Sequence, residues 1–238
     1  MLDQYMIGQM KCRAVIFDLL GTLVYNTPLA DSDNVLKQMA SVLLAPSKDF
    51  VASWHGMFTE RMTGTFKNYQ GCIQRICTDL KVLADEEQVE LAAKTRFDMT
   101  RNELITLHEG ALDVLSHLRA KGYRTGLISN CSFEATRIWG ETRLAPLIDV
   151  AVFSCSVGMM KPDPRIYGLV TEQLNVKPQD CLYIADGIGQ ELAIATQIGM
   201  HSIQILVPGE NEYDPYREKW NGPTISSLTQ ILEIIGQL

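Results

Sequence analysis

The chain has 238 residues, of which 46% are hydrophobic and 21% charged, so its composition is that of a folded globular protein rather than a disordered one. A formal net charge of −7 disfavours nucleic acid or an anionic membrane as the main partner, but it leaves room for a small anionic substrate at a locally positive site. The six cysteines form no Cys-x-x-Cys pair, the first twelve residues lack a signal-peptide pattern, and no apolar run approaches the ~20 residues of a membrane span, so we expect reduced thiols and a cytoplasmic protein.

The first predicted strand, residues 14–19, is followed by a long segment without a convincing strand. Helical patterns in this segment cover residues 31–44, 47–62, 67–83 and 85–105. An apolar stripe at helical spacing runs along the second pattern: Val51, Trp54, Phe58 and Met62. Asp85 and Gln88 resemble a capping box at the start of the fourth. We therefore expect a helical domain, residues 26–109, inserted directly after the first strand.

The rest of the chain alternates short apolar runs with helical patterns. Predicted strands at residues 123–129, 150–154, 181–185 and 202–207 barely alternate in polarity, as expected of strands that are buried on both faces of a parallel sheet. Between them, helical patterns cover residues 111–121, 163–174 and 190–198. This order predicts an α/β fold with a doubly wound, Rossmann-like parallel sheet, formed by residues 11–25 and 110–238.

Carboxylates stand at the ends of two predicted strands. Asp18 ends the first strand in the run FDLLGTL, and Asp186 ends the fourth in the run IADGIGQE. Gly21 lets the chain turn tightly and bring its backbone close to a ligand. Oxygens of Asp18 and Asp186 could share a hard cation such as Mg²⁺. Taken singly, each acid is also explained as part of a turn or as a helix cap.

Two further motifs place anion-binding groups at the same kind of position. Ser129 and Asn130 end the second strand in the run ISN, and Lys161 in the run KPDP precedes a helix that begins with a proline. A hydroxyl, an amide and an ammonium group suit an anion, although Asn130 could instead cap a helix and Lys161 could be a solvated side chain. Together the four motifs place these groups at strand ends around one crevice.

The four motifs and the position of the helical insert resemble the haloacid dehalogenase superfamily, whose members carry a helical cap directly after the first motif. The resemblance implies that Asp18 is a covalent nucleophile and that the transferring group is held by Gly21, Thr22, Ser129, Asn130 and Lys161. It also implies a Mg²⁺ ion bound by Asp18, by the backbone carbonyl of Leu20 and by Asp186. Glu191 would act on this region through water, since the superfamily more often has a shorter Asp there.

Leu20 departs from the pattern of the superfamily's phosphatases, which usually carry a second Asp at this position to protonate the leaving group. General acid–base help of this kind is typically worth ~10²–10⁴ in rate, and a leucine cannot supply it. Three functions therefore remain open: a Mg²⁺-dependent phosphatase, a 2-haloacid dehalogenase that needs no such acid, and a phosphate-binding or regulatory protein that has lost turnover. Asp186 favours the first, because dehalogenases of this superfamily need no metal.

Overall fold

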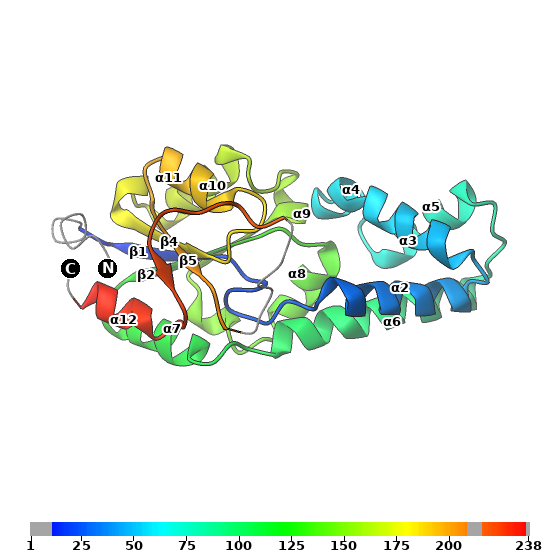
Figure 1. Ribbon diagram of the computed structural model, residues 1–238, viewed down its shortest axis with the longest axis horizontal. Helices are drawn as coiled ribbons and strands as arrows, with labels where there is room; N and C mark the ends of the chain where they lie inside the picture. Colours follow the sequence, from blue (N-terminus) through cyan, green and yellow to red (C-terminus); the bar gives the residue numbers. More distant parts are fainter. Residues whose placement is uncertain (1–10, 209–215, 237–238) are drawn as a thin grey trace.

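The protein is described here by a computed structural model that places residues 11–208 and 216–236 (Figure 1). Most of the N-terminal stretch in which the sequence lacks a signal-peptide pattern lies outside these residues. Within them, six strands form one parallel sheet in the order β3-β2-β1-β4-β5-β6. The strands are β1 (Ala14–Phe17), β2 (Arg124–Ser129), β3 (Val150–Phe153), β4 (Cys181–Ala185), β5 (His201–Ile205) and β6 (Thr224–Ile225). The prediction of a doubly wound α/β fold is confirmed.

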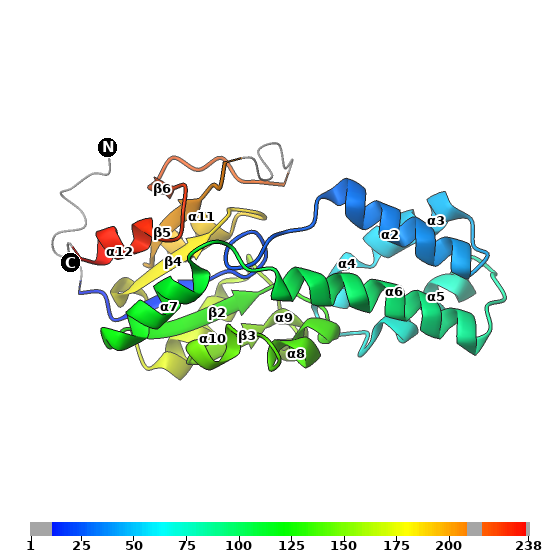
Figure 2. The same ribbon diagram turned by 90° about the horizontal axis from the view of Figure 1, so that it is seen from below.

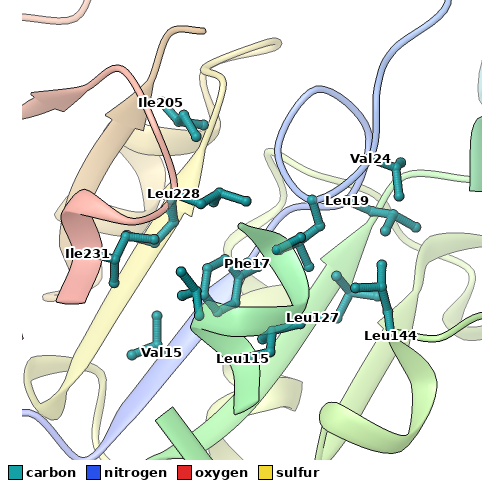
Figure 3. Close-up of a cluster of buried hydrophobic side chains, with 14 of the residues drawn as sticks. Val15, Phe17, Leu19, Val24, Leu115, Leu127, Leu144, Ile205, Leu228 and Ile231 are labelled. Carbon is teal, nitrogen blue, oxygen red and sulfur yellow. The ribbon is translucent and has the colours of Figure 1, made fainter. Parts of the chain in front are cut away.

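The sheet is buried on both faces, which is why its strands do not alternate in polarity. Along β1, Ala14 and Ile16 point into a core covered by α10 (Pro164–Leu174) and α11 (Glu191–Gln197). Val15 and Phe17 point into a second core, closed by α7 (Ala111–Ala120) and α12 (Gln230–Ile235) (Figure 3). All four β1 side chains are fully buried, so this central strand fixes both layers of helices.

Five helices follow β1 and form a module of their own, which extends away from the sheet (Figure 2). This helical module consists of α2 (Leu29–Val42), α3 (Ser47–Gly56), α4 (Phe58–Met62), α5 (Tyr69–Asp79) and α6 (Glu86–Ile105). Its side chains pack around a separate apolar core that includes Phe50, Trp54 and Ile73. None of the helices in the described residues combines the length and apolar composition that a membrane span requires.

Two details of the module test the helical periodicity. The capping box at the start of α6 is confirmed: Asp85 accepts from the Gln88 backbone at 2.8 Å, and the Gln88 side chain accepts from the Asp85 backbone at 3.0 Å. The single helix predicted over residues 47–62 is wrong, because the chain breaks at Met57 between α3 and α4. The break turns Phe58 outward, so that it is 46% exposed instead of extending the apolar stripe beside Trp54.

Two further short helices lie between strands: α8 (Phe133–Trp139) and α9 (Ser154–Val157). Both lie where strands β2 and β3 end, and the module contacts them through α6 and α4. Strand β6 was not predicted, because two residues are too short for a period-2 pattern. Since all strands are parallel, their carboxyl ends share one edge of the sheet, and it is this edge that faces the module (Figure 1).

Candidate active site

Lys161 and two carboxylates form a buried ionic cluster at the ends of β1 and β4. The Lys161 Nζ donates to the Asp18 Oδ1, and it donates to the Glu191 Oε2 at 2.5 Å. Lys161 is 5% exposed and Glu191 only 1%, so neither charge is solvated and each depends on the other. The interpretation of Lys161 as a solvated surface side chain is therefore wrong.

Asn130 fixes the backbone that carries this lysine. Its Nδ2 donates to the Lys161 carbonyl at 3.0 Å, and its Oδ1 accepts from the Lys161 backbone N–H at 2.8 Å. The paired bonds tie the end of β2 to the loop before α10. The alternative in which Asn130 caps a helix is wrong, since Ser132 stands at the N-cap of α8. The amide thus positions the lysine rather than a helix end.

Asp186 brings a third carboxylate to the cluster and leaves one oxygen unused. Its Oδ1 accepts from the Ile188 backbone N–H at 3.1 Å, while its buried Oδ2 has no hydrogen-bond partner among the described residues. Gly21 lies directly against that oxygen: a Cβ on Gly21 would stand 2.4 Å from the Asp186 Oδ2. Gly21 also has a φ of +79°, so both its conformation and its contact require glycine.

The three acids have the chemistry of a divalent-cation site. One oxygen of each of Asp18, Asp186 and Glu191 lies within 4.8 Å of the others. Three carboxylates face a single lysine charge, and the unpartnered Asp186 oxygen is a hard ligand of the kind that Mg²⁺ prefers. These residues therefore fit a Mg²⁺ ion.

Glu191 is held differently from the two aspartates. Its Oε2 also accepts from the Tyr183 hydroxyl at 2.7 Å, and its Oε1 accepts from the Gly187 backbone N–H at 3.3 Å. Both of its oxygens are thus engaged by the protein, whereas one Asp186 oxygen is not. This arrangement suits Glu191 to orienting Lys161 more than to direct contact with a metal. The Tyr183 contact was missed by the sequence reasoning, although a tyrosine inside a buried strand requires a partner for its hydroxyl.

Burial and repulsion between the carboxylates shift the pKa values of the cluster. Burial raises the pKa of Asp18 to about 6, against the opposing effect of the Lys161 charge. Burial, followed by the Glu191 and Asp18 charges, raises the pKa of Asp186 well above its ordinary value. Burial alone would lower the pKa of Lys161, but the charges of Asp18 and Glu191 outweigh it and raise that pKa. A bound divalent cation would relieve the repulsion between the carboxylates.

The other residues singled out by the sequence lie around this cluster. Thr22 is fully buried, and its Oγ1 has no hydrogen-bond partner in the described parts of the chain. Ser129 is 1% exposed at the end of β2. The Leu20 side chain is partly exposed and lines the pocket beside this cluster. The structure thus brings the residues of all four motifs to one edge of the sheet.

A pocket of about 230 Å³ opens beside the cluster, between the sheet edge and the helical module. From the sheet side it is lined by Leu19, Leu20, Ser129 and Asn130. From the module it is lined by apolar, aromatic and polar side chains, among them Glu103 and two arginines, which the motif reasoning did not find. This volume is below the roughly 300–1,000 Å³ typical of sites for drug-sized ligands, so the pocket suits a small molecule.

The module is tied to the sheet region beside this pocket by buried hydrogen bonds. The Tyr69 hydroxyl lies 3.0 Å from the Ser132 Oγ at the start of α8, and the Thr100 Oγ1 of the module itself lies 2.7 Å from the same hydroxyl. The Ser154 Oγ donates to the Met62 carbonyl at 2.7 Å. These bonds hold the module over the sheet edge.

Comparison with known proteins agrees with this geometry. The family profile described as haloacid dehalogenase-like hydrolase matches residues 12–199. The chain is 29% identical to acyl-CoA dehydrogenase family member 10 of Mus musculus, over 84% of this chain but only 18% of that protein. It is 27% identical to hexitol phosphatase A of Escherichia coli, over 86% of this chain and 90% of that one. It is 25% identical to (S)-2-haloacid dehalogenase 1 of a Pseudomonas species, over 95% and 97%.

A solved structure shares the fold. The magnesium complex of a HAD family enzyme from Bacteroides thetaiotaomicron superposes with a TM-score of 0.66 at 18% identity, covering 87% of this chain and all of that chain. At this identity the likeness concerns the fold alone. The relatives include both phosphatases and a dehalogenase, so the comparisons leave the choice between these two activities to the chemistry of the site.

Proposed function

The chain belongs to the haloacid dehalogenase-like hydrolases, and we propose that within this family it is a Mg²⁺-dependent phosphatase of a small phosphorylated metabolite. The observation that carries the proposal is the buried Asp186 oxygen that has no partner among the described residues and lies in one cluster with Asp18. A buried carboxylate oxygen without a hydrogen-bond donor requires a bound cation or a proton. Phosphoryl transfer uses such a cation, whereas displacement of a halide does not.

In this mechanism Asp18 is the nucleophile. One of its oxygens attacks phosphorus, the bond from phosphorus to the leaving oxygen breaks, and an aspartyl phosphate forms. Water then attacks the phosphorus of this intermediate, which releases phosphate and restores the carboxylate. The Mg²⁺ ion, when bound by Asp18 and Asp186, would neutralise charge on the phosphoryl oxygens. The buried position of Asp18 keeps competing water away from the nucleophile.

The other motif residues hold the phosphoryl group. Lys161 supplies a positive charge next to Asp18, and Asn130 and Glu191 position that charge through the lysine backbone and ammonium group. The Thr22 hydroxyl, which has no partner among the described residues, and the Ser129 hydroxyl at the end of β2 would donate to phosphoryl oxygens. Asn130 and Glu191 are positioning residues in this scheme, since each acts through Lys161.

Leu20 limits the substrates that such an enzyme can use. With no acid at this position, the leaving oxygen departs without a proton from the first motif. We therefore propose that the protein prefers substrates whose leaving group is stable as an anion. The helical module would act as a cap, residues 26–109, that closes over the pocket and selects the leaving group, while residues 11–25 and 110–238 form the catalytic domain.

A 2-haloacid dehalogenase is the second candidate, and Leu20 is the observation that favours it. Halide leaves without a proton, so Asp18 could displace it from carbon and form an ester that water then hydrolyses. The 25% identity to (S)-2-haloacid dehalogenase 1 is consistent with this activity. A metal-free displacement supplies no cation for the Asp186 oxygen that has no partner among the described residues, which is why we place it second.

A screen of phosphate esters and 2-haloacids, each with Mg²⁺ and with chelator, distinguishes the candidates. The phosphatase releases phosphate in Mg²⁺ and stops in chelator. Chloride release that survives in chelator would replace the proposal by the dehalogenase. If neither product forms, but phosphate with Mg²⁺ raises the unfolding temperature, the protein binds phosphate without turnover.

A further inference from the structure

Two arginines of the helical module line the pocket, and neither forms an ion pair with any residue that the structure describes. Arg61, on α4, is 5% exposed, and its Nη2 donates to the Trp54 carbonyl at 3.2 Å. Arg96, on α6, is partly exposed, and its Nη1 donates to the Ser32 Oγ at 3.3 Å. The Nε of each arginine is buried and has no hydrogen-bond partner in the described ranges.

The two guanidinium groups converge on one aromatic ring. The Arg61 Cζ lies 4.5 Å from the centre of the Trp54 ring, and the Arg96 Cζ lies 5.8 Å from it. Cation–π contacts of this kind compensate only part of the desolvation of a buried guanidinium. Burial lowers the pKa of Arg61 to about 10, and the Arg96 charge adds to this effect, but the group stays protonated near neutral pH. The pocket wall therefore carries two cations that form no ion pair within the described ranges of the chain.

The described acidic residues nearby do not serve as ion-pair partners of these arginines. Glu103 lines the same pocket, yet it is not ion-paired with either arginine in the part of the chain that the structure describes. Glu134 is buried and forms no ion pair with either arginine among the described residues, although its charge acts to raise the pKa of Arg61. A chain with a net charge of −7 thus carries, on the wall of this pocket, two arginines that form no ion pair with any residue the structure describes. The planar guanidinium group of arginine presents parallel N–H donors, which can bind two oxygens of one carboxylate or phosphate group.

We propose that Arg61 and Arg96 bind a second anionic group, a carboxylate or a phosphate, on the leaving-group side of the substrate. This proposal rests on the proposed phosphatase activity. Ser129, Asn130 and Leu20 line the same pocket next to the nucleophile, so a molecule with its phosphoryl group at Asp18 extends directly along the wall that carries the arginines. The substrate class is then a phosphate monoester with a negatively charged leaving group.

The test compares three aryl esters that differ only in the para substituent: 4-carboxyphenyl phosphate, 4-phosphonooxyphenyl phosphate and the neutral isostere 4-carbamoylphenyl phosphate. In Mg²⁺, kcat/KM should be about 10- to 100-fold higher for an anionic ester than for the carbamoyl ester, the range expected for one or two charge-assisted hydrogen bonds. The preferred anionic ester identifies whether the second group is a carboxylate or a phosphate. Equal kcat/KM for all three esters would overturn the proposal.

Variants assign the preference to the two arginines. Arg61→Met and Arg96→Met should each lower the ratio of anionic to carbamoyl kcat/KM about tenfold, and Arg61→Lys should lower it less because the charge is kept. Arg75→Met is the matched control, since Arg75 lies in the same module but is exposed and paired with Asp79. If Arg61→Met fails to fold, the ratio of anionic to carbamoyl kcat/KM in Arg96→Met alone tests the assignment. Arginine variants that keep the wild-type ratio would refute the assignment.

Binding separates failure of this inference from failure of the proposed function. The unreactive pair 4-carboxybenzylphosphonate and 4-carbamoylbenzylphosphonate is titrated into the wild-type protein with Mg²⁺ by calorimetry. Tighter binding of the carboxylate, lost in Arg96→Met, supports the arginine site even if no ester is hydrolysed. Equal affinities refute it even if every ester is hydrolysed.

Discussion

Replacing Asp18 by Asn is expected to stabilise the metal-free protein. Burial raises the pKa of Asp18 from 3.8 to about 6, so in the folded protein its ionised form is disfavoured relative to the unfolded chain. A raised carboxyl pKa gives stability below the unfolded value, which is lost as pH rises through the folded value. The shift of about two units corresponds to about 3 kcal/mol above that range. Asn keeps the shape of the protonated acid and avoids this penalty.

Urea unfolding in chelator measures the effect. At about pH 7.5, Asp18→Asn should raise the free energy of unfolding by about 2–3 kcal/mol, and near pH 4 the two proteins should be about equally stable. The exposed control Asp113→Asn should stay within about 0.5 kcal/mol of wild type at both pH values. Destabilisation by Asp18→Asn at about pH 7.5 would refute the reasoning, because it would mean that attraction to Lys161 exceeds the burial penalty.

Three other changes probe the same site. The apparent affinity for Mg²⁺ should fall as pH drops below about 6, because protonation of Asp18 competes with the metal; calorimetry that finds no pH dependence would contradict this role. Leu20→Asp should narrow the rate gap between aryl and alkyl phosphates, by up to ~10²–10⁴, and equal native rates on both esters would oppose the account. Gly21→Ala should abolish Mg²⁺ binding because its Cβ meets the Asp186 oxygen at 2.4 Å, whereas Gly158→Ala, with a similar φ of +71° and open space, should keep it. Equal Mg²⁺ affinities in the two alanine variants would count against the contact.

The position of the motif residues could be predicted because parallel strands end at one edge of a sheet. Asp18 and Asp186 each follow a buried apolar run, and this local pattern is enough to bring them together once the strands pair. The observed ends of some strands differ from the predicted ends by one or two residues, as in β5. The composition of an apolar run does not mark the residue at which the strand ends. The strands β1 to β5 were thus predictable from short-range pattern, whereas β6 was not.

Contacts between distant segments could not be predicted in the same way. The hydrogen bonds from the Asn130 side chain to the Lys161 backbone join residues 31 positions apart. Nothing in either motif indicates that the Asn130 side chain would bind the loop that carries Lys161. The place of Arg61 on the pocket wall could not be predicted either, because its burial depends on how α4 runs after the break at Met57. Spacing gives the face of a helix, but it does not give the element that packs against that face.

Acid-quenched mass spectrometry during turnover tests the central claim most directly. With an aryl phosphate and Mg²⁺, the peptide that contains Asp18 should carry one phosphoryl group, and this adduct should vanish in chelator and in Asp18→Asn. Steady phosphate release without an adduct at Asp18, or with the adduct on another residue, would contradict the account.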